Sequence, residues 1–447
     1  SLRPARKLIR GGYKASDWIG TRGVISFAKS KFSASMRRLS LPEQRKAREL
    51  PWLSLITIPL LTAFTYWRLI DQGLAEHLFD YGTEGLNAVQ AWENHGFWSM
   101  AGMFSWGQGY IPADVEPTRL YQSKTPLHLL HLWVAYKFVG SGGYPAFKLS
   151  YSLLIISLNG FLLAGIARLC FQTFSTGLRK SVVKEMVVIS TYAITITNES
   201  MLRFCMVDEP DYLGVTFWLA TILSLGLWLR RSEQQRIPRL SLALGFLTSW
   251  IYPVFGVTNV ITLLILQLFK SEQRLKSALR ALIPGSLAGI ILYWIQRLIA
   301  RAILPHKLYG SQLMDRMGMT NSMGAHDGIF DALDFIYDQR SGGIPGFLEQ
   351  SQIYIEHCAV WILGIVLFFI VLARLKGIER QIMLTLAAGG AWLFIPLLTQ
   401  SVAQHGWVYG IHFMPAIVLG WIGALTTVLP GKRSAIFGPG MLGFIPL

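Results

Sequence analysis

Charged residues are scarce in this sequence: they make up 15% of its 447 positions, whereas hydrophobic residues make up 52%. Soluble domains carry about 25% charged residues, so the composition excludes an ordinary soluble domain and indicates an integral membrane protein. Cysteine is scarcer still, with Cys170, Cys205 and Cys358 alone. They lack the spacing of metal ligands, and we expect buried free thiols, with a Cys205–Cys358 pair as the alternative.

Acidic residues are outnumbered, with 25 Asp and Glu against 41 Lys and Arg, which gives a formal net charge of +16. Much of this excess lies in residues 1–50, where the acids are Asp17, Glu43 and Glu49. Such a segment suits an anionic membrane surface, where each basic residue contributes about 1 kcal/mol. We therefore expect membrane lipids, and not nucleic acid, as its partner; an organelle transit peptide is the alternative.

The apolar residues gather in ten stretches near the length of about 20 residues that crosses a bilayer. These stretches are 51–70, 146–170, 184–202, 211–230, 238–252, 254–270, 279–300, 357–374, 381–400 and 410–429. The loops between them alternate in charge. Lys and Arg dominate 168–184, 230–239, 270–280, 374–380 and 432–433, whereas acids gather in 71–125, 201–212 and 301–357. Basic loops beside spans stay in the cytoplasm, so the acid-rich loops face the other side.

This pattern predicts an all-α polytopic membrane protein with about ten transmembrane helices. Its parts are a basic cytoplasmic arm at 1–50, a transmembrane domain at 51–430 with outer loops 71–125 and 301–356, and a tail at 431–447. An amphipathic stretch around Glu84–Trp98 and a short apolar one at 126–139 predict interfacial helices in the first outer loop. We expect a multi-pass protein of the bacterial inner membrane with a cytoplasmic N-terminus and no cleavable signal peptide.

Polar residues recur in a fixed order on the non-cytoplasmic side. Shortly after the first stretch come Phe79-Asp80-Tyr81-Gly82-Thr83-Glu84, then Gly96 with Trp98, then Lys124-Thr125-Pro126-Leu127 leading into an apolar helix. The second outer turn contains Arg203, Asp208 and Asp211. Around the start of the last stretch lie His405, Tyr409, His412 and Pro415.

This order resembles the membrane glycosyltransferases of the GT-C superfamily, such as protein O-mannosyltransferases and the aminoarabinose transferase of lipid A. In that family an acid opens the first outer loop, a glycine and aromatic element follows, and a Lys-Pro-Pro-Leu motif re-enters the membrane. Asp80 matches the first, Gly96 with Trp98 the second, and Lys124–Leu127 the third. The resemblance implies a GT-C-like fold and transfer of a sugar from a polyprenyl-phosphate donor to an acceptor.

The resemblance and elementary chemistry together suggest roles for these residues. An acceptor nucleophile needs a carboxylate base within hydrogen-bond reach, and Asp80 is the candidate. Asp208 or Asp211 is expected to orient the acceptor, stabilise oxocarbenium-like charge or hold a cation, and Glu84 is a further catalytic candidate. A departing phosphate needs fixed positive charge or donors, for which the candidates are Lys124, Arg203, His412, Tyr409 and His405. No metal site is assigned, and a divalent cation is the one open cofactor.

Two other functions are consistent with the sequence. A transporter or lipid flippase predicts ionisable residues in mid-span and broken helices, and the stretches are largely free of such acids. A non-catalytic GT-C-like subunit of a larger membrane complex is the second. It is favoured by Tyr81, which stands where a second acid is common, by Thr125, which replaces a proline, and by the basic arm. For Asp208 and Asp211, an acidic turn at a helix N-terminus is the structural alternative.

Overall fold

The computed structural model describes residues 52–71, 74–100, 127–171, 180–198, 201–202, 210–230, 239–303, 352–393 and 414–428. Across these ranges the regular structure is helical, and no strand occurs in them. The predicted all-α class is therefore confirmed for this part of the chain. The basic arm at 1–50 and the tail at 431–447 lie outside it.

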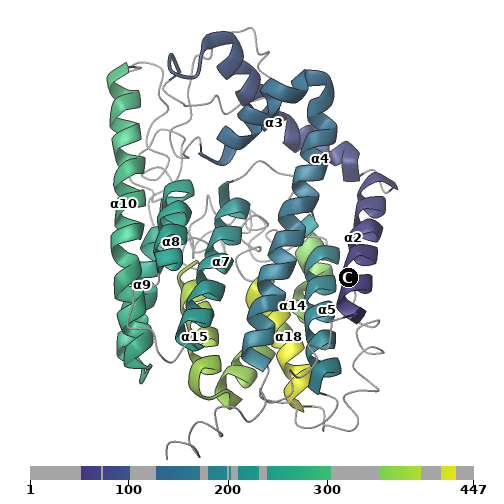
Figure 1. The fold of residues 1–447 in the computed structure, drawn as a ribbon, viewed down its shortest axis with the longest axis vertical. Helices are drawn as coiled ribbons and strands as arrows, with labels where there is room; N and C mark the ends of the chain where they lie inside the picture. The colour runs from purple at the N-terminus through teal and green to yellow at the C-terminus, as the bar shows by residue number, and fades with distance from the viewer. Residues whose placement is uncertain are drawn as a thin grey trace, which may run out of the picture. The chain divides into compact units, whose positions relative to one another are not determined.

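Eleven labelled helices make up this part (Figure 1). They are α2 (Trp52–Asp71), α3 (Leu74–His95), α4 (Leu127–Phe171), α5 (Lys180–Thr197), α7 (Pro210–Arg230), α8 (Arg239–Ile251), α9 (Pro253–Leu268), α10 (Gln273–Ile303), α14 (Gln352–Arg374), α15 (Gly377–Leu393) and α18 (Met414–Val428). Each of the ten predicted stretches overlaps one of them. The turn at Tyr252-Pro253 separates α8 from α9 because proline opens the second helix at its first position.

Three of these helices are long and apolar enough to cross a membrane: the helix at 127–171, most of α7 at 212–230, and α10 at 273–303. Shorter apolar helices lie at 239–251, 253–268, 363–374 and 414–426. The helix α9 has 16 residues, which is about 24 Å at 1.5 Å per residue. A helical membrane protein is thus supported, whereas the number of about ten spans stays a prediction.

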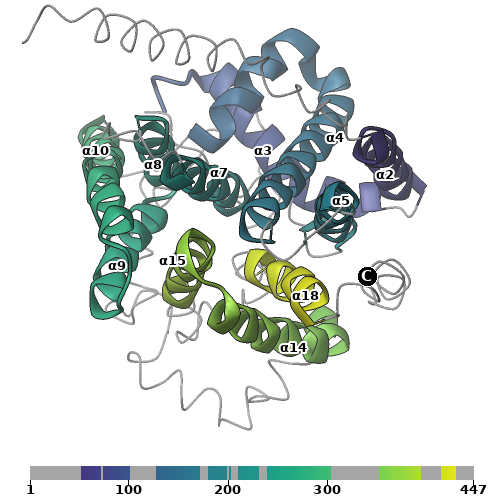
Figure 2. The same ribbon diagram turned by 60° about the horizontal axis from the view of Figure 1, so that its bottom comes forward.

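The main apolar core joins helices that are far apart in sequence. Its fully buried side chains include Ile156 of α4, Tyr192 of α5, Leu219 of α7 and Phe368 of α14. Figure 2 shows α4 beside α5 and α7, and α14 beside α18, and the residues of each of these helix pairs are in contact. These helices therefore share one continuous packed interior.

Apolar side chains also cover the outward faces of the bundle. On α10 the exposed residues Leu287, Ile291, Trp294, Ile295 and Leu298 recur at the spacing of one helical face. On α2 the exposed set includes Leu60 and Trp67. Apolar surfaces of this extent are rare on soluble monomers and mark contact with lipid or protein, which agrees with a bilayer around these helices.

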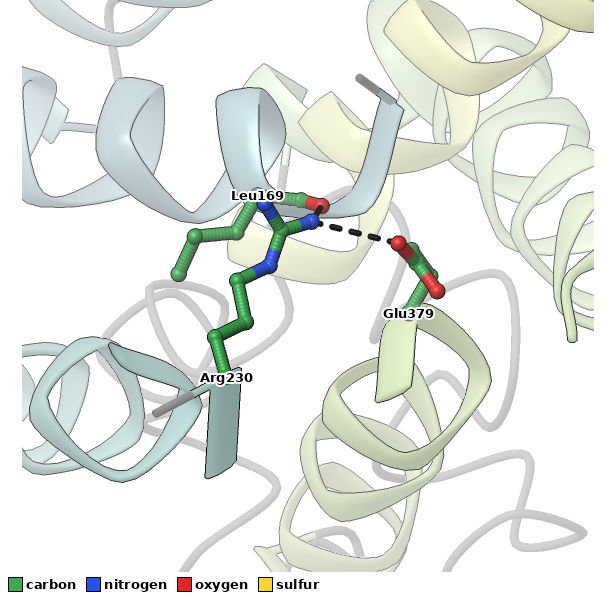
Figure 3. A network of polar contacts seen from close by, with 3 residues as sticks. All are labelled: Leu169, Arg230 and Glu379. Carbon is green, nitrogen blue, oxygen red and sulfur yellow. Dashed lines mark hydrogen bonds and ion pairs between the residues drawn. The ribbon is translucent and has the colours of Figure 1, made fainter. Parts of the chain in front are cut away.

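At the end of the bundle where α7 stops, one arginine joins three helices (Figure 3). Arg230, the last residue of α7, donates a hydrogen bond to the Leu169 carbonyl near the end of α4. The same guanidinium nitrogen lies 3.1 Å from a carboxylate oxygen of Glu379 in the first turn of α15. The terminal carbonyls of a helix lack partners within it, so Arg230 satisfies α4 and anchors α7 and α15 to it.

Glycines allow α8 and α10 to approach closely. A Cβ at Gly285 would lie 2.6 Å from the Leu242 carbonyl oxygen, and one at Gly289 would lie 2.6 Å from that of Phe246. Small residues four apart commonly permit such backbone contact between membrane helices. A hydrogen bond of 2.9 Å from the Asn259 amide to the Ser286 hydroxyl links α9 to the same face of α10.

We expect Gly289→Ala to destabilise the protein by about 1–3 kcal/mol, the usual range for overpacking. The added methyl meets the backbone of α8, which a side-chain rotation cannot relieve. Gly245→Ala is the matched control on the facing helix, because its nearest neighbour would be the Ser286 hydroxyl at 3.6 Å, an ordinary contact. Thermal unfolding in detergent compares the two variants, and equal midpoints would contradict this packing.

Candidate functional site

The predicted acids of the first outer loop lie on a helix. Asp80 and Glu84 belong to α3, which begins at Leu74, ten residues before the amphipathic stretch predicted from the sequence. The helix predicted in the first outer loop therefore begins earlier than expected and includes Asp80, whose position on the non-cytoplasmic side stays a prediction. Positions 80, 84 and 88 are spaced by four residues, so they follow one row along α3. Ala88, the third of them, is buried.

Asp211 is the second residue of α7, the place that the structural alternative of an acidic helix N-terminus predicts. The other predicted site residues lie outside the described part of the chain. They are Asp208, Lys124, Arg203, His405, Tyr409 and His412. The predicted approach of Asp80 to Asp208 or Asp211 stays a prediction.

A second apolar cluster holds α3 against the rest of the bundle. From α3 it contains Ala88 and Trp92, from α4 Leu132 and Tyr144, and from α10 Ala300, all of them buried. This cluster, called the α3 cluster below, is separate from the main core. It places the helix of Asp80 and Glu84 beside one end of α4 and the last turns of α10.

Helix α4 is two arms joined at Gly140, where φ is 64° and ψ is −176°. The rings of His131 and Tyr151 lie 4.6 Å apart between centroids, although a straight helix would separate residues twenty positions apart by about 30 Å. The chain therefore folds back at Gly140, and Figure 1 shows α4 bending over at its upper end. The first arm is 127–139, the predicted interfacial helix, and the second is 141–171, which contains the predicted span at 146–170.

The contact between α3 and the first arm is both aromatic and ionic. Phe97 stacks on Trp133 with centroids 5.0 Å apart. Glu93 of α3 accepts a hydrogen bond from the Trp133 indole and forms a 3.1 Å ion pair with Lys137. The ammonium of Lys137 also lies 4.6 Å from the centre of the Trp133 ring. These contacts fix the direction of α3, and they give Glu93 a structural role that the sequence did not suggest.

The fold-back gathers titratable and hydroxyl groups at its inner side. Tyr144 and Ser152 are buried, Lys148 is only 6% exposed, and its ammonium lies 6.0 Å from the centre of the Tyr151 ring. His131 lies on the first arm, and its Nε2 atom is buried without a hydrogen-bond partner among the described residues.

A second buried cation lies near the end of α10. Arg297 is 5% exposed and donates a 3.1 Å hydrogen bond to the Tyr293 hydroxyl. Its guanidinium carbon lies 5.0 Å from the centre of the Trp294 ring and 5.4 Å from that of Tyr293. Aromatic faces of this kind stabilise a buried guanidinium. Contacts within α10 therefore account for the burial of Arg297.

Lys148, His131 and Gly140 are not among the site residues predicted from the sequence, although a signal was present. The run Gly140-Ser141-Gly142-Gly143 is typical of a chain reversal. Lys148 is the basic residue at the start of an otherwise apolar stretch. As for metals, the described residues contain no group of three or more His, Cys, Asp or Glu that could hold an ion.

We expect Gly140→Ala to destabilise the fold-back, because φ and ψ at this position fall in a region that is almost restricted to glycine, at a cost of about 1–3 kcal/mol. No atom lies within 4 Å of a Cβ built there, so the effect is one of backbone strain alone. Gly142→Ala is the control, since it is equally open and has no positive φ. Thermal unfolding should separate the two; a stable Gly140→Ala protein would argue against the observed reversal.

Comparison with known proteins identifies no relative of this chain. No family model, no curated protein sequence and no solved structure matches this chain.

Proposed function

We propose that this protein is a membrane glycosyltransferase that moves a sugar from a polyprenyl-phosphate donor to an acceptor at the non-cytoplasmic face. The order of polar segments along the chain, which resembles that of the GT-C superfamily, is the first support. The observation that carries the proposal is the packing of α3, the helix of Asp80 and Glu84, against the fold-back of α4 in the α3 cluster. Positions 80 and 84 thus belong to a helix that packs against α4, the helix of the buried Lys148.

The chemistry follows from these residue types. The acceptor hydroxyl oxygen attacks the anomeric carbon while the bond from that carbon to the phosphate oxygen breaks. Asp80 takes the hydroxyl proton as general base, and the lipid phosphate leaves with the bonding electron pair. Fixed cations stabilise the charge that develops on the phosphate, the role proposed for Lys124, Arg203 and His412. A single displacement of this kind inverts the anomeric centre.

The same proposal includes about ten spans in a bacterial inner membrane. Its support is the alternation of basic and acid-rich loops, because basic loops are retained in the cytoplasm. The ends of α4 and α7 that Arg230 joins would then face the cytoplasm, and the α3 cluster would lie at the opposite end.

We expect a cysteine at position 235, in a cysteine-free background, to be labelled by a membrane-impermeant maleimide only after the cells are opened. One at position 110 in the first outer loop should react in intact cells. Labelling of position 235 from outside would overturn this orientation. The pair of positions controls for expression, since both proteins are probed in the same way.

We expect Asp80→Asn to keep the fold, because the change is isosteric, and to lower the transfer rate by about 10²–10⁴, the usual contribution of a positioned acid or base. Lys124→Met should instead raise the KM for the donor, since the lost partner is the phosphate. Transfer of labelled sugar from polyprenyl phosphate is measured in proteoliposomes, with monodispersity checked for each variant. Glu93→Gln is the control on α3, where the lost charge belongs to the ion pair with Lys137.

The results of these sugar-transfer assays distinguish the proposed glycosyltransferase from the alternative functions. Equal transfer by wild type and Asp80→Asn would exclude Asp80 as the base. Absence of transfer with every donor by a well-folded wild-type protein would favour the structural subunit of a larger membrane complex.

A further inference from the structure

One stripe of α10 combines basic and apolar side chains. Arg280, Leu287 and Ile291 are exposed, and Lys276 is half-buried. Because a helix of 3.6 residues per turn advances by about 100° per residue, these four side chains project within about 60° of one another. The helix is long and apolar enough to cross a membrane, and Figure 1 and Figure 2 both show it at the edge of the bundle. The stripe therefore faces the surroundings of the protein, with its cations near the start of the helix.

The length of this stripe matches one leaflet of a bilayer. From Arg280 to Ile291 the helix rises by about 16 Å, since each residue adds 1.5 Å. Half of a typical hydrocarbon core is about 15 Å thick. A phospholipid whose headgroup contacts Arg280 can therefore place an acyl chain along Leu287 and Ile291.

Helix α9 adds apolar side chains beside these cations. It runs antiparallel to α10, since Asn259 donates a hydrogen bond to Ser286 and residues 269–272 join the two helices. Leu268 and Phe269, where α9 ends, are exposed by 86% and 53%. Exposed apolar side chains next to Lys and Arg are typical of the boundary between acyl chains and lipid headgroups, because the cations extend to the headgroups. The end of α9 and the start of α10 are therefore suited to that boundary.

The exposed cations here have no carboxylate partner. Within the described part of the chain, no ion pair involves Lys270, Lys276 or Arg280. Glu272 is the one acid of the turn that joins α9 to α10. Arg274 is satisfied within the protein, because it donates a hydrogen bond to a carbonyl of α7 and stacks on a tryptophan of that helix. The other three cations therefore outnumber the acid and are available to an anion.

We propose that the α9–α10 corner, formed by Lys270, Lys276, Arg280, Leu287 and Ile291, binds an anionic phospholipid. The phosphate of the headgroup contacts the cations, and Arg280 can donate two parallel hydrogen bonds to it. One acyl chain lies along the apolar part of the stripe. An anionic lipid is favoured over a zwitterionic one, because clustered Lys and Arg beside a membrane span attract negatively charged headgroups.

The α9–α10 corner is distant from the proposed site of sugar transfer. Ala300, near the other end of α10, belongs to the α3 cluster. At 1.5 Å per residue, it lies about 36 Å from Lys276 along the helix. Lipid binding at the corner is therefore independent of the proposed glycosyltransferase and can be measured whether or not the protein transfers sugar.

The test is native mass spectrometry of the full-length protein in detergent micelles, with added phospholipids of identical acyl chains. The wild-type protein should retain dioleoyl phosphatidylglycerol in preference to dioleoyl phosphatidylcholine. Lys276→Gln and Arg280→Gln should each weaken phosphatidylglycerol binding by about 5-fold, the contribution of one basic residue at an anionic surface, and leave phosphatidylcholine binding unchanged. Arg280→Lys should bind nearly as the wild type does, because it keeps the charge.

Arg301→Gln is the matched control. It removes the same charge from an exposed position near the opposite end of α10, and it should bind phosphatidylglycerol as the wild type does. Equal losses in Arg280→Gln and Arg301→Gln would overturn the proposal. So would equal retention of the two lipids by the wild-type protein.

Inorganic phosphate tests whether the whole lipid or its phosphate alone is recognised. Compared with chloride at the same ionic strength, it should not displace phosphatidylglycerol, because the apolar part of the stripe contributes to lipid binding. Displacement by phosphate but not by chloride would contradict a lipid site and indicate a site for the free anion.

Discussion

The reversal of α4 at Gly140 depends on a φ of 64° that side-chain-bearing residues rarely adopt. Everything at the α3 end of the bundle follows from it. The reversal brings His131 against Tyr151, and it turns Trp133 and Lys137 toward Glu93 of α3. Without the fold-back, α3 would lose the surface against which its buried residues pack. The helix of the proposed base is therefore positioned by one backbone conformation.

The helices were largely predictable because hydropathy and length determine them. A run of about 20 apolar residues has few stable structures besides a helix, since a bilayer offers no partner for unpaired backbone groups. The predicted stretch 211–230 and the helix α7 at Pro210–Arg230 differ by one residue. The separation of 126–139 from 146–170 was also predicted, because a stretch of the first length is too short to cross.

The candidate site was less predictable, since it depends on contacts between distant residues. The predicted amphipathic helix began near Glu84, whereas α3 begins at Leu74 and continues through Gly82 and Gly85, with its later part packed against α4 and α10. Lys148 was not predicted as a site residue because a single lysine barely changes the mean hydropathy of its stretch. Its burial beside Tyr144 and Ser152 depends on the direction in which α4 folds, which no local pattern encodes.

The length of α9 has a consequence for the surrounding lipid. Its 16 residues are bounded by Tyr252 and Phe269, and about 24 Å is less than the roughly 30 Å of a typical hydrocarbon core. Val257, Leu264 and Leu268 are exposed on this helix. In the proposed arrangement, in which α9 crosses the membrane, acyl chains that meet these residues would have to shorten to match it. Such hydrophobic mismatch thins the bilayer locally. A thin annulus of this kind would draw headgroups toward the protein on one flank and give the membrane beside α9 a shape that distant lipid lacks.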